Sequence, residues 1–136
     1  MLPSVRVTAD RRQSLGILGE DLACEALIDR GYVVLARRYR TRLGEIDIVA
    51  RDGLTVVFVE VKARQSGVFG DGAEAVGLRK QQRIGTMAAY YLARHGLQQA
   101  PARFDVVSVL LPEAGSARVE VFRNAFDLSP TSRRGW

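Results

Sequence analysis

Two apolar runs flank an Asp52-Gly53 pair in the middle of the chain, and no other feature limits the possible folds as strongly. The runs are Gly44-Glu45-Ile46-Asp47-Ile48-Val49-Ala50 and Thr55-Val56-Val57-Phe58-Val59-Glu60-Val61-Lys62. Asp-Gly between apolar runs indicates a tight β-hairpin, because the two central residues of its turn need positive φ. We therefore predict antiparallel strands at about 43–51 and 54–63, with Arg51 opposite Leu54.

Side chains alternate between the two faces of each strand. One face is wholly apolar and carries Ile46, Ile48, Val57, Val59 and Val61, whereas the other carries Glu45, Asp47, Phe58, Glu60 and Lys62. In the predicted register Glu45 faces Glu60. Asp47 is then the diagonal neighbour of Glu60, with Cα atoms roughly 7–8 Å apart. Two carboxylates at this spacing can converge on one cation.

The charged face has two interpretations. It could be the solvated side of an amphipathic hairpin, which is the commoner case. A metal site is favoured by the opposed Glu45 and Glu60, whose like charges cost stability unless a cation or proton offsets them. It is also favoured by the many β-branched residues, which suggest a sheet covered on both sides. The residues alone leave both interpretations open.

A helix is predicted from Ser14, a good N-cap, to about Arg30, with Gly31 as its left-handed end. Its predicted buried stripe is Leu15, Leu18, Leu22 and Ala26. Gly16 and Gly19 would allow another element to approach closely. Glu20 lies at the edge of the stripe, where an acid in the first half of a helix is favoured by the helix dipole. Cys24, the single cysteine, is predicted to be a small buried residue.

The chain is basic, with a net charge of +5 and a sequence pI near 10.0. This charge suits a polyanionic partner, nucleic acid before membrane. A strand at Tyr32–Tyr39 leads into a cluster of arginines without acids beside them in the sequence, namely Arg37, Arg38, Arg40 and Arg42. They could be a solvated loop or a rim that contacts phosphates. No apolar run or leader pattern predicts a membrane span or signal peptide, so we expect a cytoplasmic protein.

A second helix is predicted from about Ala73 to His95, after a glycine-rich loop at Arg64–Gly72. Its predicted buried side is Val76, Ile84, Met87, Ala88 and Tyr91. Lys80 lies on that side, so it must reach water or an anion such as Glu60 or a bound phosphate. His95 is the only histidine, which argues against a histidine zinc site or a Ser-His-Asp triad.

Strands at Arg103–Leu111 and Arg118–Arg123 complete the pattern, and Asp105 in the first of them is predicted to pair with an arginine. The order helix, three strands, helix, two strands predicts an α/β sandwich with a mixed sheet. We expect one domain at 14–126, a flexible arm at 1–13 and a basic tail at 127–136.

Several short motifs resemble those of the YraN-like family, which is grouped with the PD-(D/E)xK nucleases of the restriction-endonuclease-like superfamily and is related to archaeal Holliday-junction resolvases. The resemblance spans about residues 14–126. The matching motifs are Gly19-Glu20, Gly44-Glu45-Ile46-Asp47, Val59-Glu60-Val61-Lys62-Ala63-Arg64, Phe69-Gly70, Lys80, Arg103-Phe104-Asp105-Val106-Val107 and Asn124-Ala125-Phe126. The chain departs from the family at Arg37-Arg38-Tyr39-Arg40, where an asparagine is expected.

The resemblance implies a restriction-endonuclease-like fold of order αβββαββ and a DNA endonuclease that depends on Mg²⁺ or Mn²⁺, with branched or junction DNA among its substrates. Asp47, Glu60 and the Val61 carbonyl would hold the ion, Lys62 would orient the attacking water, and Glu20 and Glu45 would be auxiliary catalytic acids. The implied DNA contacts are Arg37, Arg38, Arg40, Arg42, Arg64 and Lys80. Related resolvases commonly act as homodimers.

A non-catalytic nucleic-acid-binding protein that keeps the nuclease fold is the alternative, and RNA remains open as a substrate.

Overall fold

The computed structural model describes residues 8–65 and 76–127, with side chains from residue 14 onward. The elements are α1 (Thr8–Asp29), β1 (Val33–Thr41), β2 (Gly44–Asp52), β3 (Thr55–Arg64), α2 (Leu78–Arg94), β4 (Ala102–Leu110) and β5 (Arg118–Phe126). The predicted order αβββαββ and the mixed α/β class are confirmed, and the arrangement is consistent with a restriction-endonuclease-like fold.

Two helix starts and one strand end differ from the prediction. Helix α1 begins at Thr8 and not at Ser14, so the predicted arm at 1–13 includes its first turns. Helix α2 begins at Leu78 and not at about Ala73. Val76 and Gly77 lie outside the helix, and Gly77 is its N-cap, with an extended backbone conformation. The predicted residues 73–75 lie outside the described part, as do Phe69 and Gly70. Strand β5 continues to Phe126, beyond the expected Arg123.

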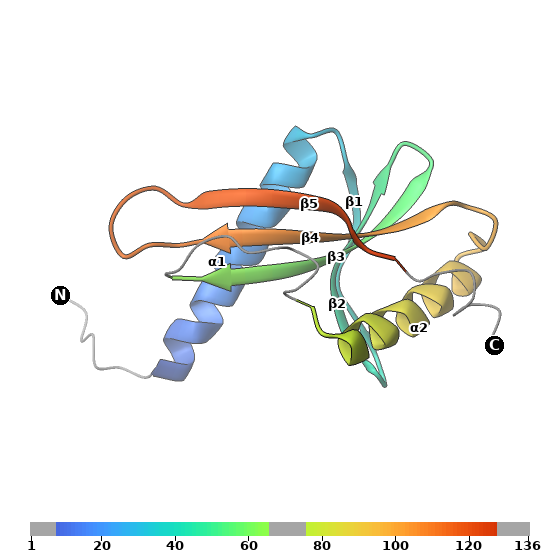
Figure 1. The fold of residues 1–136 in the computed structure, drawn as a ribbon, viewed down its shortest axis with the longest axis horizontal. Coiled ribbons are helices and arrows are strands. Elements are labelled where there is room, and N and C mark those ends of the chain that lie inside the picture. The colour runs from blue at the N-terminus through green and yellow to red at the C-terminus, as the bar shows by residue number, and fades with distance from the viewer. Residues whose placement is uncertain (1–7, 66–75, 128–136) are drawn as a thin grey trace.

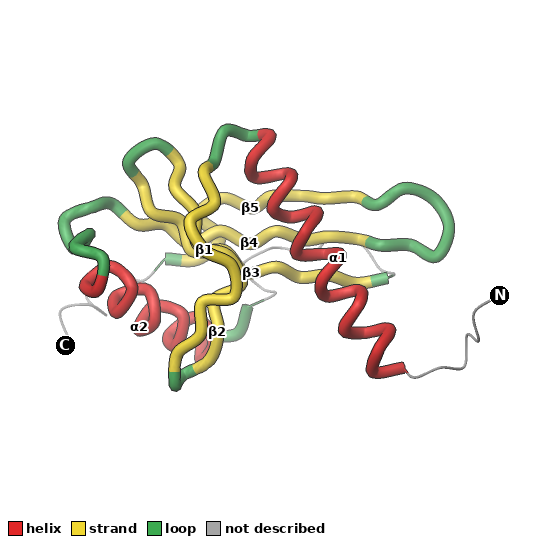
Figure 2. Tube along the Cα trace, turned by 180° about the vertical axis from the view of Figure 1, so that it is seen from behind, coloured by secondary structure: helices red, strands yellow, loops and turns green. Residues whose placement is uncertain are grey.

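The five strands form one sheet in the order β1-β2-β3-β4-β5. Strands β3 and β4 are parallel and are connected through α2, whereas the other neighbours are antiparallel. Helix α1 crosses one face of the sheet over β3, β4 and β5, and α2 lies on the opposite face, beside the end of β2 that follows the β1–β2 turn (Figures 1 and 2). Both faces of the central strands are therefore covered, as their β-branched composition predicts.

The core has two layers that follow the alternation of the strands. Ile48, Val57 and Val59 pack with α1, whereas Val49 and Phe58 pack with α2. The predicted buried side of α2 is confirmed at Ile84, Met87, Ala88 and Tyr91, and Val76 is buried just before the helix.

The predicted stripe of α1 is wrong at Leu18, which is 46% exposed, but Leu15 and Leu22 pack against the core as predicted. The buried positions of the helix are Gly19, Glu20, Ala23, Cys24 and Leu27. The small side chains among them, above all Gly19, let the helix approach β3 closely. A Cβ atom at Gly19 would lie 2.6 Å from the Cβ of Ala63, whereas Gly16 faces open space. Close packing at Gly19 brings the next residue, Glu20, against the sheet, and Cys24 is buried as predicted.

The hairpin register differs from the prediction by two residues. Asp52 pairs with Thr55, so the turn residues are Gly53 and Leu54 and not Asp52 and Gly53. Gly53 has a φ of 62° and Leu54 has no positive φ, so the turn needs only one left-handed residue and glycine occupies it. Because side chains alternate with period two, the shift keeps Ile48, Val57 and Val59 together on one face as predicted. Ile46, predicted for that face, packs instead with Val49 and Phe58 on the α2 side. Extended by one pair, the observed register places Asp47 directly opposite Glu60.

No helix within residues 8–65 and 76–127 is long and apolar enough to cross a membrane.

Candidate active site

The site begins where β2 and β3 separate. Their paired residues run from Asp52–Thr55 to Ile48–Val59 and end there. Beyond this point the Val61 N–H donates to Asp47 Oδ2 at 2.7 Å, so a side chain takes the place of a strand partner. Figure 1 shows β2 turning away from β3 toward α2. The divergence exposes the edge of the central strand to a cleft.

This cleft has a volume of about 450 Å³ and lies among α1, β1, β2 and β3. It is lined by Gly16, Ile17, Glu20, Arg38, Arg40, Glu45, Asp47, Val61, Lys62 and Ala63. The structure therefore brings together Glu20, Glu45, Asp47, Val61 and Lys62, which come from three separate elements. Glu60 is not among the residues that line the cleft.

Asp47 and Glu60 form a carboxyl pair, in which Glu60 is buried, only 6% exposed, and Asp47 is half-buried. Burial raises the pKa of Asp47 to about 7, with further upward contributions from the charge of Glu60 and a hydrogen bond shared with it. The Val61 N–H and the charge of Lys80 act in the opposite direction, since both stabilise the ionised form. The pair therefore retains a proton until near neutral pH, because two adjacent buried carboxylates cannot both ionise easily.

Two lysines lie at this pair in different ways. Lys80 reaches from α2 and forms an ion pair with Glu60, as its position on the buried side of the helix predicted. Lys62 lines the cleft and forms no ion pair with any residue in the described ranges 8–65 and 76–127. One ammonium thus partly neutralises the carboxyl pair, and the other faces the cleft.

Arginines from β1 bind the outer acids of the cleft. Glu20 accepts hydrogen bonds from Arg37 at 2.8 Å and from Arg38 at 3.3 Å, and Arg37 also donates to Asp21 at 2.6 Å. Arg37 and Arg38 have no acids beside them in the sequence, but the fold gives both of them acidic partners. Their partners are distant in sequence, and only the packing of α1 on the sheet brings them close.

The remaining predicted DNA contacts differ in their surroundings. Arg40 donates to Glu45 at 2.9 Å. Arg42 lies in the β1–β2 turn and lines a different groove. Arg64 lies at the exposed end of β3 and lines neither hollow.

Arg38 has a φ of 55°, a left-handed conformation that asparagine adopts far more readily than arginine. It falls in the stretch where the family resemblance led us to expect an asparagine.

The donor set fits a small hard cation. Among the residues that the structure describes, no group of three or more His, Cys, Asp or Glu side chains is placed to hold a metal ion. Asp47, Glu60 and the Val61 carbonyl nevertheless offer oxygen ligands, and Mg²⁺ commonly takes one or two protein carboxylates and keeps several waters. The unfavourable charge between the two carboxyls is also what a bound cation would relieve.

A family model described as "Uncharacterised protein family UPF0102" matches residues 19–109, which hold all the cleft acids together with Lys62 and Lys80. The chain belongs to this family. A UPF0102 protein of Syntrophus aciditrophicus is 48% identical, over 84% of this chain and 89% of its own length. UPF0102 proteins of Parafrankia sp. and Moorella thermoacetica are 50% and 47% identical, over 84% and 85% of this chain and 97% of each relative. The predicted YraN-like family is thereby confirmed.

Sequence reasoning missed two components of the UPF0102 site. The first is the Val61 N–H that holds Asp47, which depends on the separation of the strands and has no pattern in the sequence. The second is Asp21, which shares Arg37 with Glu20. Adjacent acids on a helix that faces an arginine-rich strand could have indicated this pairing.

Proposed function

We propose that this UPF0102 protein is a metal-dependent endonuclease of the PD-(D/E)xK class, which hydrolyses phosphodiester bonds in DNA. One observation carries the proposal, namely the pairing of half-buried Asp47 with buried Glu60 at the edge of a cleft that Lys62 also lines. A carboxyl group with a raised pKa beside a cleft, as at Asp47, is a common mark of a functional site. The overall positive charge fits a polyanionic substrate.

Asp47, Glu60 and the Val61 carbonyl would hold Mg²⁺ or Mn²⁺. When bound, the ion polarises a phosphoryl oxygen and lowers the pKa of an attacking water. The hydrogen bond from the Val61 N–H fixes one oxygen of Asp47 and leaves the other available as a ligand. Lys80 holds Glu60 from the opposite side and keeps its carboxyl aligned.

Lys62 would orient the water and stabilise negative charge on the phosphoryl group, since its ammonium faces the cleft without an internal partner among the described residues. Glu20 and Glu45 would hold further waters at the rim, and each is fixed in place by arginine. The guanidinium groups beside them would contact the phosphates that flank the scissile bond.

The proposed substrate is DNA in the cytoplasm, with branched or junction DNA as its first candidate form. Because a four-way junction has two-fold symmetry, symmetric cleavage needs two sites, and we propose a homodimer for that reaction.

The test is cleavage of fluorescent linear, flapped and four-way junction DNA in Mg²⁺ or Mn²⁺. Glu60→Gln and Lys62→Met should each abolish the product, while Glu25→Gln, an exposed acid on α1, should cleave like wild type. Calorimetric titration with Mn²⁺ gives a readout apart from activity. Glu60→Gln should lose metal binding, whereas Lys62→Met should keep it, because in the proposal Glu60 is a metal ligand and Lys62 is not.

Cleavage that survives in both variants would refute the assignment. DNA binding that persists in EDTA, weakens steeply with salt and never gives product would instead favour a non-catalytic binding protein with this fold. The same assay with RNA of matched sequence decides between the two nucleic acids.

A further inference from the structure

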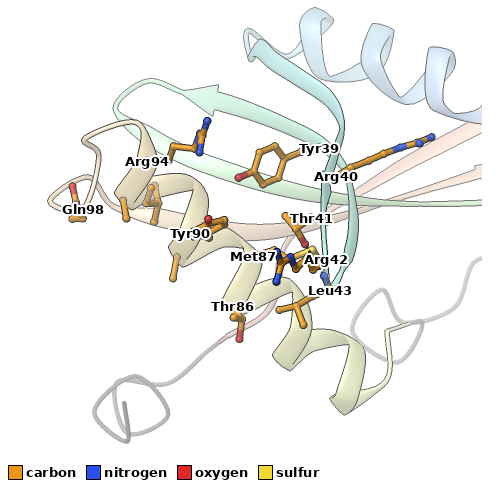
Figure 3. Close-up of a pocket in the computed structure, with 13 residues that line it drawn as sticks. Tyr39, Arg40, Thr41, Arg42, Leu43, Thr86, Met87, Tyr90, Arg94 and Gln98 are labelled. Atoms are coloured by element: carbon orange, nitrogen blue, oxygen red, sulfur yellow. Dashed lines mark hydrogen bonds between the residues drawn. The ribbon is translucent and has the colours of Figure 1, made fainter.

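A larger groove lies next to the cleft, between the β1–β2 turn and α2. It has a volume of about 1450 Å³, and it is lined by Tyr39, Arg40, Thr41, Arg42 and Leu43 on one side and by residues of α2 and Gln98 on the other. Figure 3 shows the turn residues facing Thr86, Met87 and Tyr90 across this groove. The residues proposed to perform hydrolysis do not line it.

The charge of the groove has one sign. Its lining contains Arg40, Arg42 and Arg94 and no acidic residue. Within residues 8–65 and 76–127, neither Arg42 nor Arg94 has a carboxylate partner, in contrast to Arg38 of the cleft, which binds Glu20. Two guanidinium groups that face a groove without internal partners favour an anionic occupant.

The surface between these cations is apolar and aromatic. Tyr90 is 59% exposed and Leu43 is 47% exposed, and Met87 and Leu92 also contribute to the lining. Tyr39 is held at one wall by an edge-on contact with Tyr91, with ring centroids 5.1 Å apart. Large exposed apolar side chains gathered in one hollow indicate an interaction site.

The groove and the cleft meet at Arg40, which lines both. In Figure 3 the Arg40 side chain extends away from α2, and its guanidinium binds Glu45 at the rim of the cleft. A chain molecule whose phosphate lies at Asp47 can therefore pass Arg40 and continue into the groove.

We propose that the groove binds a single-stranded segment of nucleic acid that continues from the cleft, an inference that rests on the proposed nuclease function. A duplex presents mainly phosphates to a protein surface and would leave the apolar lining unused. A single strand offers unstacked base faces, which pack on aromatic and apolar side chains while arginines follow the backbone. Arg42 and Arg94 contact phosphates, and Tyr90 stacks on a base. The substrate class is thus DNA with a single-stranded arm, such as a flap.

The test measures binding without cleavage, in EDTA, by fluorescence anisotropy. The probes are a labelled oligothymidylate of about 15 nucleotides, within the site sizes usual for single-strand binders, and a blunt hairpin duplex. The variants are the double substitution Arg42→Ala/Arg94→Ala and the single substitution Tyr90→Leu. The matched control is Arg51→Ala/Arg83→Ala, which removes two exposed arginines from β2 and α2 that line neither hollow.

We expect the double arginine variant to bind the single strand about tenfold more weakly, with a salt slope reduced by about 1.4, since each lost phosphate contact on a single strand is worth about 0.7. Tyr90→Leu should weaken single-strand binding about fivefold or more, in keeping with the loss of one stacked base. Both should change duplex binding much less, and the control should bind both probes like wild type.

Three results would overturn the proposal: wild type that binds no single strand, groove variants that match the control, or an equal loss for single strand and duplex. If the groove is instead a contact between two copies of the chain, sedimentation velocity should show a dimer that the Tyr90→Leu substitution dissociates. Binding of the single strand should then be unchanged. The anisotropy measurement does not require hydrolysis. It therefore tests binding in the groove even if the protein proves not to be a nuclease. Conversely, if the protein cleaves DNA but its groove variants bind the single strand like wild type, only the groove proposal is refuted.

Discussion

Two carboxylate sites on the same sheet are built in opposite ways. Asp105, on β4, is 0% exposed and accepts hydrogen bonds from the Tyr32 hydroxyl at 2.9 Å, from Arg103 at 2.9 and 3.1 Å, and from the Asn124 N–H at 2.9 Å. Both of its oxygens have donors, and Arg103 supplies the opposite charge. The predicted pairing of Asp105 with an arginine is confirmed.

Asp47 and Glu60 have fewer compensating groups. Asp47 accepts one backbone hydrogen bond and faces a second carboxyl, and the pair shares a single ammonium from Lys80. A buried charge that lacks an opposite charge costs stability, and proteins keep such groups mainly where they have a function. The contrast teaches that burial alone does not distinguish a structural carboxylate from a functional one. The distinguishing property is whether hydrogen-bond donors and opposite charges fully compensate the carboxylate.

The largest expected effect is on hydrolysis. Asp47→Asn keeps an acceptor for the Val61 N–H but removes a ligand charge, so cleavage should fall roughly 10³-fold or more, the size expected when several kcal/mol of metal assistance are lost. Its unfolding temperature should equal or exceed that of the wild type, because the repulsion with Glu60 is gone. Cleavage kinetics and thermal unfolding check both outcomes, and the exposed Asp29→Asn is the matched control. A variant that loses activity only because it unfolds would contradict the contrast.

The second effect is on stability at the other site. Asp105→Ala leaves the buried guanidinium of Arg103 with one remaining carboxylate, Asp52 at 3.0 Å, and leaves the Tyr32 hydroxyl without its acceptor. Removal of one partner from a buried ion pair commonly costs about 3–5 kcal/mol of unfolding free energy, which urea denaturation can measure. A loss below about 1 kcal/mol, similar to that of an exposed substitution, would show that Asp105 is not a structural centre.

Much of this arrangement followed from sequence because it depends on periodicity. The alternation of Asp47, Glu60 and Lys62 placed them on one face, and that result survived a register error of two residues because two is the strand period. The spacing of Lys80 from Ile84 and Met87 placed it on the buried side of a helix, where an acid was the natural partner.

The features that were missed depend on three-dimensional packing. The stripe of α1 was misplaced at Leu18, which is exposed, because the close approach to Ala63 turns Gly19 toward the sheet. The pairing of Arg37 with Glu20 depends on that same rotation of the helix. The network around Asp105 joins Tyr32, Asp52 and Asn124, which no local pattern relates.

The third effect is a pH dependence confined to the metal-free protein. The pKa of Asp47 is raised from its ordinary value of 3.8 to about 7, so the folded state binds more protons than the unfolded state between these values. Its stabilising contribution is complete below about pH 4 and is lost as the pH rises through 7. The free energy of unfolding in EDTA should therefore fall across this range, relative to Asp47→Asn measured in parallel.

Mg²⁺ or Mn²⁺ should reduce this loss at high pH, because a cation binds the deprotonated pair. Parallel pH curves for wild type and Asp47→Asn in EDTA would show instead that the carboxyl pair does not control the titration.

The smallest effect tests whether exposed charges contribute to the completeness of the Asp105 site. Arg123 reaches Asp52 at 3.3 Å, but its side chain is 59% exposed, whereas that of Arg103 is 14% exposed. Exposed ion pairs are usually worth less than about 1 kcal/mol, so Arg123→Ala should lower the unfolding free energy by no more than this in urea denaturation. Arg51→Ala, another exposed arginine, is the control. A loss as large as that of Asp105→Ala would mean that Asp105 depends on a cation from the surface. Neither carboxylate site would then be fully compensated by buried partners. Only the contact between the carboxyl groups of Asp47 and Glu60 would still distinguish the two sites.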